Sequence, residues 1–445
     1  MKTRMLSVLA LLLVGVSAAR AETVAIVHAR AWTMTADTPL DNATIVVTDG
    51  KIVSVGAGTA APAAARVIDA KGQPVTPGLM HSATQLGLLE ASGANETVDS
   101  RVTTGTLGAG FDIQYAINPN SVLIQLARAD GLTRAIAYPG STAVAPFAGT
   151  GVLLHLNEST DLLERTAVGV FVVIGNRSTS AGGSRAAQWK LLRLALDAAK
   201  TGLASPASPA TRTSEFLALE PVLAGKVPLA VSTNRESDIL QSIKLASDYS
   251  VKVIIVGGAE AWMAAEQLAK AKIPVLADPQ MNLPISFDAI GSRLDNAALL
   301  HEAGVTVATN VISGIYQSYN AGLSIREGAG LAVANGLPYI DGLRGLTTVP
   351  AQIWGIADRY GTLAAGKDAD IVIWDGDPLE PATLAQTVMI QGKEVSLVTR
   401  QTQLRDRYLP GTGITLAPGM SGARSAPTAP SVPGAPSAPT APSAQ

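Results

Sequence analysis

The sequence offers few side chains that could carry out hydrolytic or redox chemistry. It contains four histidines, namely His28, His81, His155 and His301, and no cysteine. The lack of cysteine excludes disulfides, thiolate metal sites and cysteine nucleophiles together. Any metal site would therefore have to use imidazole and carboxylate groups.

The most informative histidine lies in the segment Val75-Thr-Pro-Gly-Leu-Met-His-Ser-Ala-Thr-Gln85. β-forming residues end at Pro77-Gly78 and a short apolar run follows, which predicts a strand over residues 79–85. Successive side chains of a strand point to opposite faces, so His81, Ala83 and Gln85 would share one face. We interpret His81 as a neutral, hydrogen-bonded core residue, and a role in pocket chemistry is the alternative.

The other histidines have structural interpretations. His28 lies in a β-rich segment, and His155 ends a short predicted strand with Glu158 as its one acidic neighbour in sequence. His301 falls near the end of a predicted helix, where the helix dipole favours a cation. A metal site assembled from His81, His155 and His301 is the alternative hypothesis.

A serine hydrolase mechanism has no support in the sequence. No Gly-x-Ser-x-Gly segment occurs in the chain. The nearest segment, Gly182-Gly-Ser-Arg-Ala186, follows a loop rich in Ser, Thr and Gly instead of a strand. We interpret it as the N-terminal cap of a helix that begins at Arg185.

Strands and helices alternate through the middle of the chain. Apolar strands are predicted over residues 132–138, 152–155, 168–174, 227–231, 251–256, 273–276 and 305–309. Helices are predicted over residues 121–130, 185–200, 236–249, 259–270, 295–303, 327–336 and 343–353. Strands that are apolar throughout and alternate with helices predict an α/β fold with a parallel sheet, here a closed (β/α)8 TIM barrel.

β-rich segments flank this barrel on both sides. The first contains Asp49-Gly50, a strong hairpin signal because a type I′ turn needs positive φ at both central residues. The second includes a strand at 370–374 and another at 388–397 that is broken by Gln391-Gly392. We expect residues 22–75 and 360–400 to form one small composite β-sandwich, with the barrel over residues 76–359.

Three separated segments carry a resemblance to a known family. They are Asp49-Gly-Lys-Ile52 with Val75–Gly78, then Leu346-Thr-Thr-Val-Pro-Ala351, and finally Gly361–Glu380. In this order they resemble the amidohydrolase superfamily, particularly its imidazolonepropionase-like branch, over residues 23–400. The resemblance implies a barrel that uses zinc or another divalent metal to hydrolyse C–N bonds in amides, cyclic amides or dipeptides.

The same resemblance implies where the metal ligands of the family fall in this chain. The family carries Asp-x-His-x-His at the end of strand 1, where this chain has His81, Ala83 and Gln85. The strand-5 histidine position is Ser232, and the strand-8 aspartate position is Asn310.

Two further ligand positions are less regular. The strand-6 histidine position falls at Gly257-Gly258. The strand-4 ligand has no secure position. Glu220 lies upstream of strand 5 and could be considered for it, but its setting, Leu217-Ala-Leu-Glu-Pro221, resembles a structural loop. An amide has no usable proton affinity near neutrality, so Asn310 cannot act as a general base. We therefore expect no bound metal and name no catalytic residue.

A polar pocket can remain where the ligands are replaced. The candidate positions are His81, Ala83, Gln85, Ser232, Gly258 and Asn310. Asn234 and Arg235 are candidate substrate contacts, and Arg235 would pair either with a substrate carboxylate or with an internal acid.

The chain ends predict an exported protein. Residues 1–21 combine Lys2 and Arg4 with an apolar run and Ala19-Arg-Ala21, which is typical of a signal peptide cleaved near Ala21 and places the protein in the periplasm. Its removal takes away three positive charges and changes the net charge from −2 to −5.

No later segment has the ~18 apolar residues of a membrane span. Residues 411–445, rich in Pro, Ala and Ser, predict a disordered tail.

Three functional hypotheses follow. The first is an exported amidohydrolase-fold protein that has lost metal-dependent hydrolysis and that binds a small molecule or keeps only a vestigial pocket. The second is an active amidohydrolase or dipeptidase with a non-standard site. The third is a structural subunit in a homo-oligomer or in a hetero-oligomer with a related amidohydrolase. Nucleic acid is excluded as a partner, because the net charge is negative and no basic run is present.

Overall fold

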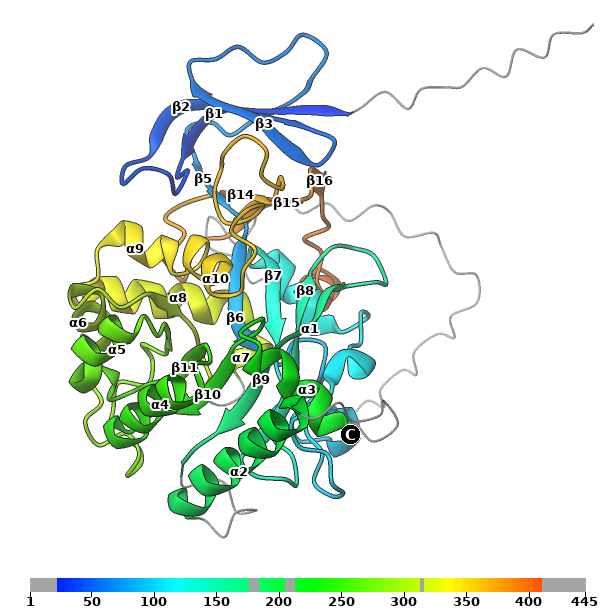
Figure 1. Ribbon diagram of the computed structural model, residues 1–445. Coiled ribbons are helices and arrows are strands. Elements are labelled where there is room, and N and C mark those ends of the chain that lie inside the picture. The colour runs from blue at the N-terminus through cyan, green and yellow to red at the C-terminus, as the bar shows by residue number, and fades with distance from the viewer. Residues whose placement is uncertain (1–21, 176–183, 205–212, 313–315, 410–445) are drawn as a thin grey trace, which may run out of the picture.

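Two β-sheets organise the structure. The computed structural model describes residues 22–175, 184–204, 213–312 and 316–409. Figure 1 shows one sheet, drawn in blue and orange, next to a larger barrel part drawn in cyan, green and yellow. The predicted signal peptide at 1–21 and the predicted tail at 411–445 lie outside the described residues.

The barrel sheet contains eight strands in the order β13-β12-β11-β10-β9-β8-β7-β6. Their bounds are β6 (Leu79–Thr84), β7 (Leu132–Ala137), β8 (Phe147–His155), β9 (Leu163–Val173), β10 (Leu229–Thr233), β11 (Val253–Gly257), β12 (Val275–Ala277) and β13 (Val307–Thr309). Among the described residues β6 and β13 share no hydrogen-bonded ladder, so the barrel is nearly closed. The predicted barrel-like α/β fold is confirmed.

One strand departs from the predicted all-parallel barrel. β8 pairs antiparallel with β7 and with β9, and Arg134 lies opposite His155. No helix separates these three strands, which form a meander. The prediction of a uniformly parallel sheet was wrong here, because β8 is buried along its whole length and such an apolar run does not reveal its direction.

Helices cover the outside of the barrel (Figure 1). They are α1 (Val122–Ala129), α2 (Arg185–Ala204), α3 (Ser214–Leu223), α4 (Glu236–Tyr249), α5 (Ala265–Ala271), α6 (Asn296–Glu302), α7 (Tyr316–Tyr319), α8 (Ala321–Ala334), α9 (Tyr339–Arg344), α10 (Thr348–Ile353) and α11 (Arg400–Tyr408). Short 3-10 turns are η1 (Asn95–Thr97), η2 (Ile113–Ala116) and η5 (Ala261–Ala264). Helix α4 matches its predicted range. Glu220, which we interpreted as a loop residue, lies inside α3, because this helix accommodates Pro221.

The second sheet joins the two ends of the chain. Its order is β16-β15-β14-β5-β1-β2-β3, with β4 paired to β1. The bounds are β1 (Thr23–Ala31), β2 (Leu40–Thr48), β3 (Lys51–Ala57), β4 (Arg66–Asp69), β5 (Pro74–Pro77), β14 (Ile371–Trp374), β15 (Ala385–Ile390) and β16 (Lys393–Glu394). The join is antiparallel, with Ile373 opposite Val75. A two-layer sandwich stays a prediction.

The predicted hairpin at Asp49-Gly50 is confirmed. Both residues have positive φ, +50° and +74°, as a type I′ turn requires. The turn connects β2 to β3, and a Cβ on Gly50 would lie 2.8 Å from the carbonyl oxygen of Gln391. Glycine is therefore required both for its backbone conformation and for the close approach of the two ends of the chain.

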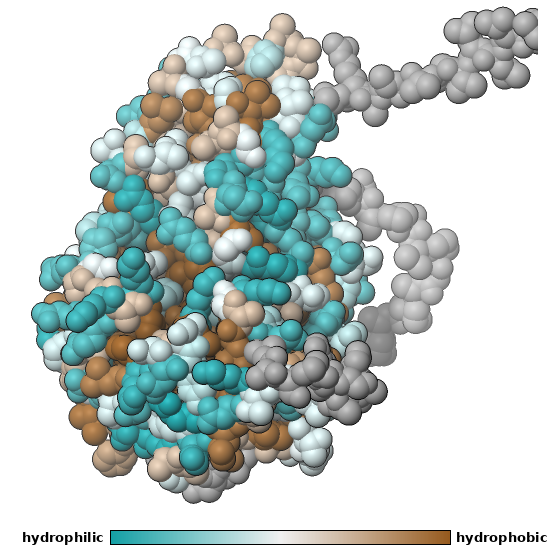
Figure 2. All heavy atoms as spheres, viewed as in Figure 1, coloured by the Kyte–Doolittle hydropathy of each residue, from teal (hydrophilic) through white to brown (hydrophobic). Residues whose placement is uncertain are grey.

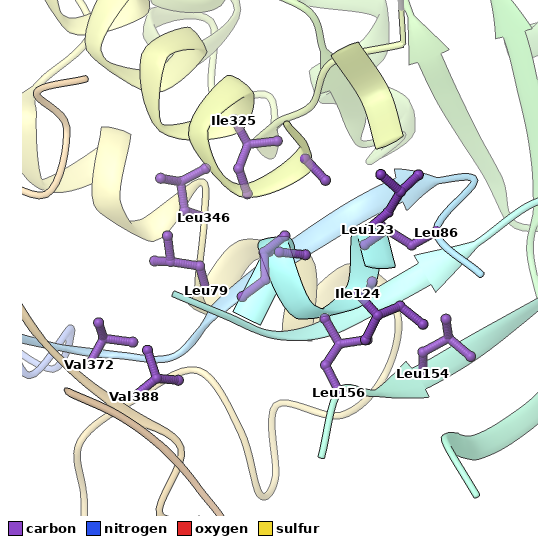
Figure 3. Packing of buried hydrophobic residues seen from close by; sticks show 14 of the residues in the cluster. Leu79, Leu86, Leu123, Ile124, Leu154, Leu156, Ile325, Leu346, Val372 and Val388 are labelled. Carbon is purple, nitrogen blue, oxygen red and sulfur yellow. The ribbon is translucent and has the colours of Figure 1, made fainter. Parts of the chain in front are cut away.

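Apolar side chains connect the barrel to its helices and to the second sheet. Figure 3 shows Leu79 of β6 close to Leu346 and to Ile325 of α8, and all three are fully buried. Val372 and Val388 of the second sheet belong to the same cluster. The hydrophobic core therefore continues from one sheet into the other. On the outside, Figure 2 shows apolar residues gathered in the middle of the barrel part among polar ones.

A buried arginine at the base of the barrel holds the two sheets together. Arg134 of β7 is 0% exposed, and its Nε lies 2.8 Å from Glu164 of β9. Its two Nη atoms contact Asp370 and, at 2.6 Å, Asp368. The guanidinium also lies 4.5 Å from the ring centroid of Tyr360. One cation thus neutralises carboxylates from the barrel and from the segment that enters β14.

The carboxylates around Arg134 have further partners. Lys51 of β3 lies 2.6 Å from Asp368, and Arg359 contacts Glu164. Burial alone would raise the pKa of Asp370, but Arg134, His155 and the main-chain N–H of Gln391 hold it below its usual value. Asp370 therefore stays ionised in the folded protein at neutral pH.

No helix within the described ranges is both long enough and apolar enough to cross a membrane.

Substitution of Arg134 with methionine tests this network. The change leaves buried carboxylates without their cation, so we expect the free energy of unfolding to fall by about 3–5 kcal/mol. Lys244→Gln is the control, because Lys244 pairs with Asp248 on the surface of α4 and its loss costs less than about 1 kcal/mol. Urea unfolding of both variants measures the difference. Equal losses would contradict a central role for Arg134.

Candidate functional site

The interior of the barrel is filled by apolar and aromatic side chains. Tyr138, directly after β7, stacks on Phe171 of β9 with ring centroids 5.2 Å apart. Phe171 stacks in turn on Trp354, which follows α10, at 5.9 Å. Burial, aided by the nearby charge of Asp278, raises the pKa of Tyr138, so its phenol is neutral at physiological pH. The barrel is thus packed along its axis. The candidate site is confined to the end of the barrel at which its parallel strands end, which we call the mouth.

A hydrogen bond connects the strand-1 position Ala83 with the strand-8 position Asn310 at the mouth. The main-chain N–H of Ala83 donates to Oδ1 of Asn310 over 3.2 Å. Asn310 is 0% exposed, and its Nδ2 has no hydrogen-bond partner among the described residues. Because β6 and β13 share no ladder within the described chain, the side chain of Asn310 bridges the seam between them. The amide serves here as a structural bridge.

His81 lies in the same buried region. Its Nδ1 accepts a long hydrogen bond of 3.4 Å from the N–H of Ala83, and its Nε2 has no partner among the described residues. Burial lowers the pKa of His81 to about 3, so the ring is neutral at physiological pH. The predicted neutral core histidine is consistent with this geometry.

The simple alternation predicted for this strand is interrupted. The pairing of β6 with β7 shifts register between His81 and Thr84. Met80 and Ala83 both belong to the apolar cluster inside the barrel, although strict alternation would place them on opposite faces. Gln85 lies just past the strand and is 9% exposed. The argument that residues 81, 83 and 85 share a face therefore does not hold across the irregularity.

The strand-5 residues are engaged with their own neighbours. Ser232 is partly buried in β10, and Oδ1 of Asn234 accepts a hydrogen bond of 3.3 Å from the N–H of Ala259. Nε of Arg235 lies 3.3 Å from a carboxylate oxygen of Asp238, although the N–H does not point at this oxygen. Arg235 was expected to pair with a substrate carboxylate or with an internal acid, and in the structure it lies next to the internal acid Asp238.

The strand-6 position is a tight turn. Gly257 and Gly258 have φ of +97° and +66°. A Cβ on Gly258 would lie 3.0 Å from Cβ of Ala261, and the Gly258 N–H donates to the carbonyl of Thr233 at 2.8 Å. A histidine ligand at this position would be strained in its backbone and crowded in its side chain.

Two buried carboxylates near the mouth were missed by sequence reasoning. Asp278, directly after β12, accepts hydrogen bonds from the main-chain N–H of Gln280 at 3.0 Å and of Ile312 at 3.1 Å. Glu260 accepts from Glu236 N–H at 3.0 Å and from Gly291 N–H at 2.8 Å. The signal for Asp278 was its place after an apolar strand. Both carboxylates anchor the backbone of loops.

The residues present do not fit a catalytic metal. Among the described residues no three His, Asp or Glu side chains are grouped so that they could hold one ion. Ala83 and Gly258 have no donor side chain, and Oδ1 of Asn310 already accepts a main-chain hydrogen bond. The strand-4 ligand has no predicted position, and Glu220, the acid considered for it, lies in α3.

The remaining histidines lie in separate places. His28 contacts Asp69 at 2.9 Å in the second sheet, and Nε2 of His155 lies 3.8 Å from Asp370 at the base of the barrel. The expectation that Glu158 is the one acidic neighbour of His155 was wrong, because the fold brings in Asp370 from far along the chain. His301, in the last turn of α6, is 3.6 Å from Asp341.

Comparison with known proteins identifies the family. The model of the amidohydrolase family matches residues 230–398, which include the strand-5, strand-6 and strand-8 positions and the closing strands. Together with the relatives below, this match supports membership of the amidohydrolase superfamily. The amidohydrolase tasK of Hapsidospora irregularis is 24% identical over 375 residues. That match covers 74% of this chain and 37% of the length of tasK.

Solved structures share the fold of this chain. An amidohydrolase from Thermotoga maritima MSB8 superposes with a TM-score of 0.76 at 24% identity, over 84% of this chain and 99% of that chain. Molinate hydrolase gives 0.51 at 16% identity, over 85% and 95%. A prolidase complexed with N-methylphosphonate-L-proline gives 0.51 at 15% identity, over 84% and 99%.

The buried state of His81 predicts a pH dependence of stability. The unfolded chain takes up a proton near pH 6.5 and the folded chain only near pH 3, where burial places the pKa. Between these values the unfolded state binds more protons, so the free energy of unfolding falls as the pH is lowered. We expect the contribution of His81 to this fall to be about 0.7 kcal/mol between pH 7 and pH 6 and to approach about 1.4 kcal/mol per pH unit at lower pH.

Urea unfolding at pH 7, 6 and 5 measures the slope. His81→Leu removes the titrating ring and should flatten the dependence by this amount, whereas His301→Gln, at a partly exposed position, should leave it nearly unchanged. If His81→Leu has the slope of the unmodified protein, His81 does not titrate as a buried neutral histidine.

Proposed function

We propose that this protein is an exported member of the amidohydrolase superfamily that has lost metal-dependent hydrolysis and binds a small polar molecule at the barrel mouth. The observation that carries the proposal is the hydrogen bond from Ala83 N–H to Asn310 Oδ1. By resemblance, the strand-8 position would hold a metal-binding aspartate. In this chain the position is Asn310, and its partner is the main chain of β6. Export rests on the signal-like residues 1–21, and we place the protein in the periplasm.

Unpaired polar atoms at the mouth support a binding role. Nε2 of His81, Oγ of Ser82, Oγ1 of Thr233 and Nδ2 of Asn310 are buried without hydrogen-bond partners in the described part of the chain. A buried polar group without a partner costs about 1–3 kcal/mol. A ligand that offers an acceptor oxygen, such as a carbonyl or hydroxyl oxygen, to Asn310 Nδ2 would offset part of this cost.

The hydrolysis hypothesis is tested directly by metal content and turnover. Full-length mature protein is incubated with zinc, manganese or iron, desalted and analysed by mass spectrometry for metal. The substrate panel contains amides, cyclic amides, a dipeptide ending in proline and molinate, because a prolidase and molinate hydrolase share the fold. We expect less than about one tenth of an equivalent of metal and no turnover.

The variant Asn310→Asp is included in the same assay. It restores one carboxylate, but the other ligand positions remain Ala83, Gln85, Ser232 and Gly258, so we expect turnover to stay absent. Stoichiometric metal with turnover that a chelator abolishes would overturn the proposal and favour an active amidohydrolase or dipeptidase with a non-standard site.

A specific observation favours a second candidate, a subunit that assembles with another barrel protein. The segment between β12 and α6 exposes large apolar side chains, with Leu283 at 63%, Ile285 at 66%, Phe287 at 84% and Ile290 at 61%. Apolar residues that gather on a surface are typical of protein interfaces. We propose this segment as the contact with a second amidohydrolase-type barrel, either another copy or a relative.

Association is measured by light scattering during gel filtration and by co-purification from the native host. We expect Ile285→Ser/Phe287→Ser to convert an oligomer into a monomer without loss of stability. Leu217→Ser on α3, which is 54% exposed, is the matched control and should leave the oligomer intact. A monomer at all concentrations with no co-purifying barrel protein would exclude this candidate.

A further inference from the structure

A second concave surface lies at the opposite end of the barrel from the mouth. It is a groove with a cavity volume of ≈ 1220 Å³. Pro228, Val253 and Pro274, which line it, stand at or next to the starts of β10, β11 and β12, and Val168 lies in β9 just before its pairing with β10 begins. The mouth residues instead lie at or after the ends of the strands. The groove is therefore separate from the candidate site described above.

The floor of the groove is apolar. Val227, Ile243 and Ile353 line it and are only partly buried. Trp354 also lines it at 2% exposure, and its Nε1 has no hydrogen-bond partner among the described residues. The volume exceeds the ~300–1,000 Å³ that is usual for a small-molecule pocket, so an elongated ligand fits the groove.

The rim of the groove is positively charged. Lys226, Lys252, Lys270 and Lys272 line it together with Arg165, and no Asp or Glu is among the lining residues. The four lysines are exposed, and in the described ranges none of their ammonium groups has an ion pair or hydrogen bond. Arg165 donates a hydrogen bond to the carbonyl of Trp354. Arg165 lies in β9, Lys226 and Lys252 precede β10 and β11, and Lys270 and Lys272 lie at the end of α5 before β12. All five line the same groove as the apolar floor.

The surrounding structure does not cancel this charge. Helices α3, α4 and α5 end close to the groove, with C-caps at Ala224, Ser250 and Lys272. Each helix C-terminus is equivalent to about half a negative charge. Asp358 acts on Arg165 as one further negative charge. Five cations then leave a surplus of roughly two positive charges, in a protein whose net charge is negative.

We propose that this groove binds an elongated organic anion, with the acidic head between Lys226, Lys252 and Lys272 and the apolar body along the floor towards Trp354. The positively charged rim, which contains no Asp or Glu, would pair with the acidic head of such a ligand, and the apolar floor would contact its hydrocarbon body. A soluble aliphatic carboxylate of medium length has this chemistry. A neutral amphiphile would leave the rim unpaired, and a cationic one would be repelled.

Titration calorimetry on the full mature protein tests the proposal with decanoate, below the concentration at which it forms micelles. Decyltrimethylammonium has the same chain length and the opposite charge, and we expect it to bind at least about tenfold more weakly. The affinity for decanoate should fall as the ionic strength rises, because the lysines are exposed to solvent.

Two variants locate the site. Lys252→Gln/Lys272→Gln should weaken decanoate binding about tenfold. Ala271→Trp, at an exposed groove position, should block the apolar floor. Lys190→Gln/Lys393→Gln removes the same charge from exposed positions outside the groove and should bind decanoate as the unmodified protein does. Equal decanoate affinity in all variants, equal binding of the cationic amphiphile, or no binding of decanoate would overturn the proposal.

Discussion

The structure depends on the buried Arg134. A guanidinium with 0% exposure is stable only because Glu164, Asp368 and Asp370 surround it at hydrogen-bond distance and Tyr360 covers its face. Glu164 belongs to the barrel, whereas the two aspartates lead into the closing strands of the second sheet. The two ends of the chain are therefore connected to the base of the barrel by charge as well as by apolar packing. This end of the barrel supports the fold.

At the opposite end, the positions where the family has metal ligands carry other residue types. The strands that would present metal ligands are in place, but Ala83 and Gly258 have no donor groups and Asn310 is bonded to the main chain of the first strand. The turn at Gly258 has a positive φ of +66°, a backbone conformation that favours glycine over histidine. At Gly258 the difference from the family's ligand thus extends to the backbone geometry. The proposed binding function at the mouth needs no metal ligand.

Much of the fold could be predicted from local patterns. The hairpin at Asp49-Gly50, helix α4 and most barrel strands follow from turn chemistry and from periodicity, because these signals act over a few residues. The direction of β8 could not be predicted, since a strand that is buried on both faces has the same pattern in either orientation. Helix α3 was missed because it contains Pro221.

The sequence by itself indicated the family resemblance, the order of the elements and the residue types at the positions where the family has metal ligands, because each of these depends on residue identity at a local motif. Only the tertiary structure decided what the replaced positions do. The bridge from Ala83 to Asn310 spans 227 positions, and the neighbour of His155 is Asp370 from the far end of the chain. The cationic groove likewise collects lysines from separate segments, namely those before β10 and β11 and the end of α5. Such contacts depend on which segments meet in space, and no local pattern carries that information.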